Sequence, residues 1–197
     1  MKKHRIGLFG GSFNPVHTGH LILADFVLDK LALEKMIFIP TFRTPGKDEL
    51  FFPPEERLDM LNLVVPENPH FEVSDIEIQK KEISYTYFTL EFMKNKYPDS
   101  DLYYIIGMDN FLAFNTWYKY EALLKTATFV VLPRNKQFEP SDLNQNFINS
   151  GDFIFLDAPI IDINSTEIRN TLSQQHDIKY LVPDKVYEYL KKNRRIS

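Results

Sequence analysis

The stretch GGSFNPVHTGH, residues 10–20, decides the fold that this sequence predicts. It follows an apolar, strand-like run at residues 6–9 and leads into a run with apolar residues at helical spacing. Such a strand, turn and helix start bind phosphate groups in α/β proteins, because backbone N–H groups point outward and the helix dipole favours negative charge. His17 and His20 fall on one face if both lie at the helix start. A protonatable His20 in a first helical turn indicates an anionic ligand.

Short apolar runs alternate with helical patterns along the rest of the chain. The predicted strands are residues 5–9, 36–40, 71–73, 102–106, 128–132 and 153–156. The predicted helices are residues 18–33, 54–65, 85–97, 118–125, 165–173 and 183–194. This pattern predicts an α/β protein with an open, doubly wound, Rossmann-like and mostly parallel sheet, helices on both faces, and ligands at the carboxyl ends of the strands. The polar segments 41–52 and 134–149 are expected to be surface loops beside that cleft.

The composition narrows the class of protein. A length of 197 residues suits one domain, over residues 1–197, and a net charge of −4 offers no basic field for nucleic acid. The absence of cysteine excludes disulfides, thiolate zinc sites and a cysteine nucleophile. No apolar run approaches the roughly 20 residues of a membrane span, and the run behind the basic residues 1–5 is too short for a secretion signal. We therefore expect a soluble, cytoplasmic protein whose partners are neither nucleic acid nor membrane.

The glycine turn does not match the better-known phosphate-binding patterns. It lacks the spacing of G-x-G-x-x-G, and it lacks the Gly-Lys-Ser/Thr of a P-loop. A zinc site is weakly supported, since His17 and His20 need further ligands and the other three histidines show no ligand-like spacing.

A second helix start, NSTEIR at residues 164–169, carries an unexplained charge. Asn164 and Glu167 are spaced as a capping box, which accounts for every polar residue except Arg169. A cation in the first turn opposes the helix dipole unless an anion lies there. Two such helix starts together would clamp a triphosphate.

Two further segments contain candidate binding residues. Gly107 and Asp109 follow a buried strand, where the acid could bind a ribose hydroxyl or organise a metal, although Gly-x-Asp is also a common turn. Trp117, with Tyr118 beside it, fits either the core or a stacking surface.

The remaining candidates have ordinary structural interpretations. Ser84, Tyr85 and Thr86 are first a helix N-cap and only second a site of backbone amides. Lys47 and Arg134 lie in the two predicted loops, where a solvated cation is the default interpretation.

The motif Gly-x-Phe-x-x-x-His-x-Gly-His, residues 11–20, with Ser-Thr-x-x-Arg at residues 165–169, resembles the nucleotidyltransferase superfamily of adenylyl- and cytidylyltransferases. The elements at residues 84–86, 107–109, 117–118 and 131–134 look like those of the bacterial nicotinate-nucleotide adenylyltransferases, over nearly the whole chain. This resemblance implies the reaction of ATP with nicotinate mononucleotide to deamido-NAD and pyrophosphate, a step of NAD synthesis.

The resemblance also implies roles for individual residues. His17, His20 and Arg169 would be catalytic, and Mg²⁺ would be carried on the ATP phosphates without a protein metal site. The ATP site would comprise Gly10, Gly11, Ser12, Phe13, His17, His20, Gly107, Asp109, Ser165, Thr166, Ile168 and Arg169. The nicotinate mononucleotide site would comprise Lys47, Ser84, Tyr85, Thr86, Trp117, Tyr118 and Arg134. The pyridine ring would lie on Trp117, with its carboxylate at the amides around Tyr85 and Thr86.

The chain departs from the family pattern at two places. Gly46 stands where many members have histidine, which removes one imidazole, and Asn164 replaces a serine as helix cap with little expected effect. Two alternatives stay open, namely another small nucleotidyltransferase of the pantetheine-phosphate or glycerol-phosphate type, or a nucleotide sensor without turnover. A homodimer is also compatible with the sequence.

Overall fold

The structure, a computed structural model, describes residues 3–46, 50–132 and 145–193. The strands are β1 (His4–Gly11), β2 (Lys35–Pro40), β3 (Phe71–Val73), β4 (Ser100–Gly107), β5 (Thr128–Leu132) and β6 (Phe153–Phe155). The helices are α1 (Thr18–Lys30), α2 (Pro54–Val64), α3 (Ile76–Lys80), α4 (Thr86–Lys96), α5 (Met108–Leu112), α6 (Tyr120–Leu123), α7 (Gln145–Ile148), α8 (Ser165–Ser173) and α9 (Asp184–Lys192). Two 3-10 turns, η1 (Val65–Glu67) and η2 (Phe114–Thr116), complete these elements.

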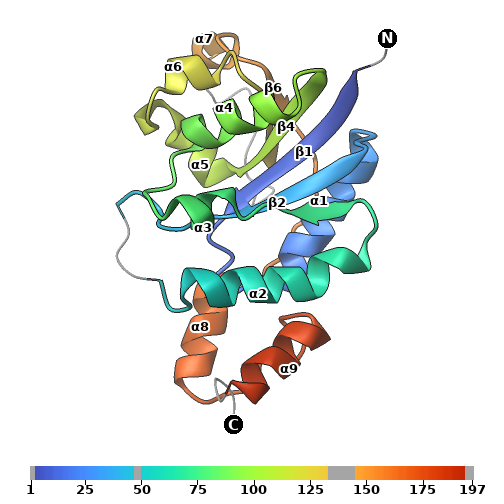
Figure 1. Ribbon diagram of the computed structural model, residues 1–197, viewed down its shortest axis with the longest axis vertical. Coiled ribbons are helices and arrows are strands. Elements are labelled where there is room, and N and C mark those ends of the chain that lie inside the picture. Colours follow the sequence, from blue (N-terminus) through green and yellow to red (C-terminus); the bar gives the residue numbers. More distant parts are fainter. Residues whose placement is uncertain (1–2, 47–49, 133–144, 194–197) are drawn as a thin grey trace.

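The strands of the described residues form a six-stranded parallel sheet in the order β3-β2-β1-β4-β5-β6. The chain therefore starts in the middle of the sheet and builds outward in both directions, so the strand order reverses between β1 and β4. In such sheets, ligands bind outside the carboxyl ends of the strands at this point of reversal. The ends of β1 and β4 are thus the place to look for a site (Figure 1).

Alternate residues of the strands other than β3 contribute to two different hydrophobic cores. On β5, Phe129 and Val131 belong to one core, while Val130 and Leu132 belong to the other. The core with Val130 also takes buried residues from α1, α2, α8 and α9, and the core with Phe129 takes them from α4, α5 and α6. Because side chains alternate across a strand, this division puts helices on both faces, as the sequence predicts (Figure 1).

The sequence predicts all six strands, but the helices differ in detail. The first helix ends at Lys30 because Ala32 adopts a positive φ of 45°, and the predicted helix at 118–125 shrinks to α6 because Lys119 has a φ of 54°. The short helices α3, α5 and α7 are missing from the prediction; α5 replaces an expected turn and α7 lies in an expected loop. Elements of four or five residues are too short for helical periodicity to show.

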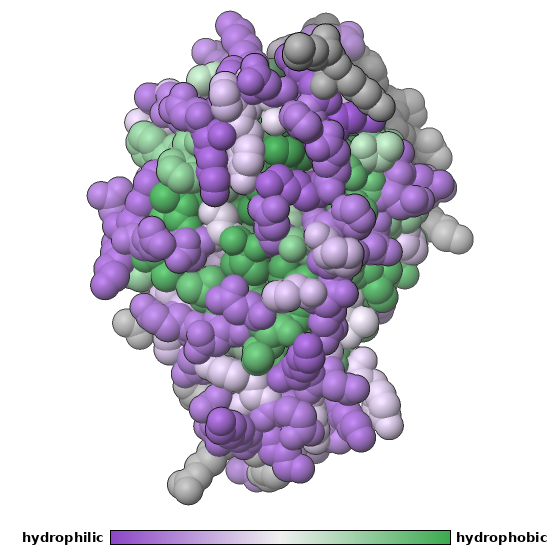
Figure 2. Space-filling view, turned by 45° about the vertical axis from the view of Figure 1, so that its right-hand side comes forward, coloured by the Kyte–Doolittle hydropathy of each residue, from purple (hydrophilic) through white to green (hydrophobic). Residues whose placement is uncertain are grey.

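The surface mixes apolar and hydrophilic side chains. Figure 2 shows apolar side chains in a band across the middle of one face, with hydrophilic ones above and below it. Exposed apolar residues of this kind are ordinary in soluble proteins. Along the described ranges, no helix is both long and apolar enough to cross a membrane.

Candidate active site

The glycines that end β1 allow another side chain to approach the backbone closely. A Cβ at Gly10 would collide with the hydroxyl of Tyr104 on the neighbouring strand β4, so only glycine fits there. Tyr104 is buried, and burial raises the pKa of its hydroxyl well above the usual range. The Thr86 side chain opposes this rise. Tyr104 thus lies between the glycine turn and the start of α4.

The two histidines form a compact pair at the start of α1. His17 is the residue that precedes the helix, in extended conformation, and its ring stacks on the His20 ring at 3.6 Å between centroids. The His17 backbone N–H donates to Nδ1 of His20 at 3.2 Å, and the Phe13 ring packs edge-on to His20 at 5.0 Å. Because Nδ1 accepts this hydrogen bond, it carries no proton, and the ring proton of His20 sits on Nε2. In this geometry His20 can donate a hydrogen bond through Nε2.

The start of α8 is attached directly to the same turn. The Ser165 hydroxyl donates to the Pro15 carbonyl at 3.0 Å, and Arg169 Nη1 donates to the Asn14 carbonyl at 2.9 Å. Arg169 Nη2 also donates to Thr166 Oγ1 at 3.1 Å. Partial burial lowers the pKa of Arg169 from its ordinary value. The structure thus brings together the two separated motifs, and within the described residues the printed bonds of Arg169 use two of its five N–H donors.

Asn164 caps α8 as the sequence predicts. Its side chain accepts a hydrogen bond from the backbone N–H of Glu167 at 2.9 Å, which satisfies one free donor of the first turn. The cap leaves Arg169 outside this local pattern, consistent with its bond to the distant turn.

The predicted acceptor segments also meet. Tyr85 precedes α4, and its ring lies 5.0 Å from the ring of Tyr118. Trp117 is half-buried and stacks on Phe114 at 5.1 Å between ring centroids, which places it at the edge of the core. The N–H groups of Thr86 and Tyr87 come before the first hydrogen bond of α4, which Phe88 donates to Tyr85, and N–H groups at this position of a helix can receive an anion.

Gly107 and Asp109 lie at the end of β4, the strand that pairs with β1. Gly107 ends β4 and precedes α5 in extended conformation, with a φ of −77° that any residue adopts. Asp109 lies exposed in the first turn of α5. Both stand at the carboxyl edge of the strand beside β1, as the site requires.

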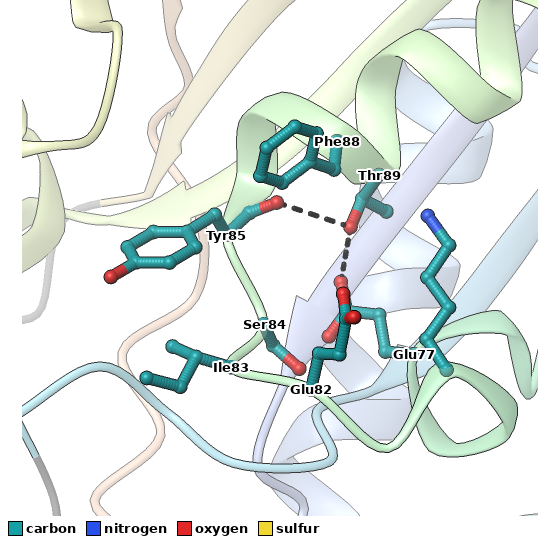
Figure 3. Close-up of a pocket in the computed structure, with 8 residues that line it drawn as sticks. Glu77, Glu82, Ile83, Ser84, Tyr85, Phe88 and Thr89 are labelled. Atoms are coloured by element: carbon teal, nitrogen blue, oxygen red, sulfur yellow. Dashed lines mark hydrogen bonds between the residues drawn. The ribbon is translucent and has the colours of Figure 1, made fainter.

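A pocket of about 110 Å³ opens beside the start of α4 (Figure 3). Its lining residues are Glu77, Lys80, Glu82, Ile83, Ser84, Tyr85, Phe88 and Thr89. The carboxyl group of Glu77 is buried, accepts a hydrogen bond from Thr89 Oγ1 and leaves Oε2 without a hydrogen-bond partner. Burial raises the pKa of Glu77. Two carboxyl groups, of Glu77 and Glu82, and one ammonium group, of Lys80, thus face this pocket.

Two residues of the predicted ATP site are buried. The side chains of Phe13 and Ile168 are 1% and 0% exposed and pack in the core. Lys47 and Arg134 lie outside the described residues. Gly46 has a φ of +70°, and no atom of the described residues lies within 4 Å of its Cβ position. Glycine adopts this backbone freely, whereas the family's histidine would adopt it only with strain.

Sequence reasoning missed Arg57 on α2, a fully buried residue that donates to three backbone carbonyls around the site. A signal was present in the sequence. Arg57 has the helical spacing of Met60, Leu61 and Val64, so it is a charge on the apolar face of a predicted helix.

Comparison with known proteins identifies the family of this chain. The family model described as cytidylyltransferase-like matches residues 8–171. A "probable nicotinate-nucleotide adenylyltransferase" of Caldicellulosiruptor bescii is 40% identical over 193 residues, covering 95% of this chain and 96% of that protein. One of the same name from Lactiplantibacillus plantarum is 40% identical over 190 residues, covering 96% and 86%. The chain belongs to the nicotinate-nucleotide adenylyltransferase family. It is therefore a nucleotidyltransferase.

Solved structures have the same fold as this adenylyltransferase-family chain. The nicotinic acid mononucleotide adenylyltransferase of Plasmodium falciparum, complexed with NaAD, has a TM-score of 0.76 at 21% identity and covers 97% of this chain and 96% of its own. A second structure of that protein, complexed with APC, has a TM-score of 0.78 at 19% identity, with coverages of 98% and 96%. At these identities the likeness concerns the fold, which is the Rossmann-like fold that the sequence predicts.

Proposed function

We propose that this protein transfers the adenylyl group of ATP to nicotinate mononucleotide, giving deamido-NAD and pyrophosphate, in NAD biosynthesis. The observation that carries the proposal is the junction of two helix starts, where Arg169 of α8 and Ser165 bind the turn that presents His17 and His20. This junction gathers N–H donors and one guanidinium at the carboxyl edge of the sheet. Donors of this kind bind a triphosphate, and the transfer requires no protein side chain to react with the substrates.

The acceptor phosphate is already an anion, so the reaction needs neither a general base nor a covalent intermediate. A phosphate oxygen of nicotinate mononucleotide attacks the α-phosphorus of ATP in line. The bond from that phosphorus to the oxygen that bridges to the β-phosphorus breaks, and pyrophosphate leaves with the electron pair. The protein has to align the two phosphates and stabilise the developing charge. We assign that stabilisation to the Nε2–H of His20 and the free N–H groups of Arg169, with His17, Ser165 and Thr166 beside them.

We assign the rest of the ATP site to the backbone of residues 10–13 and to Gly107 and Asp109 near the ribose. Mg²⁺ enters as part of the substrate, Mg·ATP. Within the described ranges, no three His, Cys, Asp or Glu side chains come together in a way that could hold a metal ion.

We propose that nicotinate is distinguished from nicotinamide at the start of α4. The pyridine ring would lie against the exposed side of Trp117, with its carboxylate at the amides of Tyr85 and Thr86. An N–H donor matches a carboxylate oxygen, whereas the NH₂ of a carboxamide would place a donor against a donor.

We also propose that residues 1–197 form one nucleotidyltransferase domain. The single sheet from β3 to β6 and the family match over residues 8–171 support this. The lack of cysteine fits a reducing cytoplasm, where we propose that the protein works.

The deciding experiment measures pyrophosphate release from Mg·ATP with nicotinate mononucleotide and nicotinamide mononucleotide in parallel. We expect a strong preference for the nicotinate form. Equal rates with the two mononucleotides would support a nucleotidyltransferase but contradict the proposal that the α4 amides select nicotinate over nicotinamide. No release with either would direct the search to pantetheine phosphate and glycerol phosphate as acceptors, and then to a nucleotide sensor.

A further inference from the structure

Arg57 is a buried cation in the middle of the molecule. Its side chain is 0% exposed, and burial lowers its pKa to about 10, so it keeps its charge at neutral pH. Its guanidinium donates hydrogen bonds to backbone carbonyl oxygens. The carboxylates of Glu55 and Glu77 also attract its charge through space. Burying a charge costs more than burying an apolar side chain of the same volume, so packing alone does not explain an arginine here.

The three carbonyls that Arg57 binds come from three different segments. Nη1 donates to Ser12 of the glycine turn at 2.6 Å, and Nη2 donates to Phe42, just after β2, at 3.1 Å. Nε donates to Phe52, just before α2, at 3.1 Å. The Phe52 N–H in turn donates to Asn14 Oδ1 at 2.9 Å, which ties this segment to the glycine turn a second time. One planar side chain thus holds Phe42 and Phe52 against the glycine turn.

The connection continues from Phe42 to the start of α4. The Phe42 N–H donates to Ser84 Oγ at 2.9 Å, and the Ser84 N–H donates to the carbonyl of Arg43 at 2.9 Å. Ser84 directly precedes Tyr85. A continuous chain of hydrogen bonds therefore runs from Ser12, through Arg57, Phe42 and Ser84, to the helix start that we assign to the second substrate.

We propose that Arg57 is a positioning residue that fixes the distance between the two substrate half-sites. This inference rests on the proposed function, because it assigns the glycine turn to ATP and the start of α4 to nicotinate mononucleotide. In-line transfer needs the reacting atoms about 3–3.5 Å apart, and a misplacement of about 1 Å costs about 10²-fold in rate. Arg57 touches neither substrate in this proposal and acts through the two segments that do.

The test uses Arg57→Lys, which keeps the charge but cannot reach three carbonyls. Arg5→Lys is the matched control, because Arg5 is also partly buried and hydrogen-bonded, to Tyr103, at the opposite end of β1. For Arg57→Lys we expect kcat to fall by about 10²-fold while the Kd of each substrate, measured alone by calorimetry, changes less than about threefold. Arg5→Lys should keep its kcat. A lowered melting temperature with unchanged kcat for Arg57→Lys would make Arg57 a structural brace and overturn the proposal.

A second variant follows the path without removing Arg57. Ser84→Ala removes the hydrogen bond that Phe42 N–H donates to Ser84 Oγ. If Arg57 acts through this chain of hydrogen bonds, the double variant of Ser84→Ala and Arg57→Lys should lose little more activity than the less active single variant. If the fold losses in kcat of the two single variants multiply in the double variant, Arg57 and Ser84 act independently, and the proposed chain of hydrogen bonds is contradicted.

A measurement without turnover separates this inference from the proposed function. Amide exchange of Ser84, followed by NMR in the unliganded protein, should accelerate in Arg57→Lys and stay unchanged in Arg5→Lys. Unchanged exchange at Ser84 in Arg57→Lys would overturn the coupling even if the wild type forms deamido-NAD. Absence of turnover in the wild type would overturn the proposed function, while the exchange result would still decide the coupling.

Discussion

Arg169 Nη1 donates a hydrogen bond of 2.9 Å to the backbone carbonyl of Asn14, 155 residues earlier in the chain. This bond joins the second helix start to the glycine turn. The two halves of the family signature are therefore in direct contact in the fold.

The first prediction concerns that contact. Arg169→Lys keeps a charge but cannot bind Asn14, Thr166 and a phosphate together, so we expect kcat to fall by about 10²-fold. Asn170→Ala, at the neighbouring exposed position of α8, is the control and should leave kcat within twofold of wild type. Steady-state pyrophosphate release checks both variants. Wild-type kcat for Arg169→Lys would remove Arg169 from the chemistry.

The second prediction concerns the proton on His20. Because Nδ1 accepts the N–H of His17, ¹⁵N NMR of the ring should show the Nε2–H tautomer in the unliganded protein. His20→Ala should lower kcat by roughly 10²–10³-fold, the scale for one preorganised donor. His176→Ala, an exposed histidine, should change neither kcat nor fold. An Nδ1–H tautomer would contradict the proposed donor.

The third prediction separates the two faces of Trp117. Trp117→Ala removes the stack on Phe114 and, in our proposal, the surface for the pyridine ring. We therefore expect a KM for nicotinate mononucleotide raised by about 10-fold, from about 1–1.5 kcal/mol of lost aromatic contact, with the KM for ATP unchanged. The melting temperature should also fall. Tyr180→Ala, at an 86% exposed aromatic, controls for both readouts. A fall in melting temperature alone would make Trp117 a core residue.

The fourth prediction follows from the raised pKa of Glu77, which burial causes and which Thr89, Ser84, Lys80 and Arg57 oppose. In the folded protein, the carboxyl group of Glu77 stays protonated at pH values at which the unfolded chain has already lost this proton. The contribution of Glu77 to stability is thus present below its ordinary pKa of 4.5 and is lost as pH rises through the folded-state value.

Glu77→Gln keeps the acceptor for Thr89 and removes the titration. We expect its melting temperature to match the wild type at pH 4 and to exceed it at pH 8. Glu82→Gln, an exposed carboxylate beside the same pocket, should follow the wild type at both values. If the melting temperature of Glu77→Gln equals that of the wild type at both pH 4 and pH 8, burial does not disfavour the charged form of Glu77.

The short helices show one limit of prediction from sequence. α3, α5 and α7 have four or five residues, so they cannot repeat an apolar spacing, and their positions depend on the strands that they follow. The long elements were predictable because their apolar residues repeat with the period of a strand or a helix over enough positions.

The sequence by itself determined the doubly wound sheet, the two helix starts with their histidines and arginine, and the family to which the chain belongs. Each of these is carried by neighbouring residues, where spacing and residue type act locally. The tertiary structure alone decided that Nδ1 of His20 accepts a hydrogen bond from His17, that Ile168 and Phe13 pack in the core, and that Arg57 joins three segments. These features depend on which backbone groups meet across the fold, and no local pattern records a hydrogen bond between residues far apart in the chain.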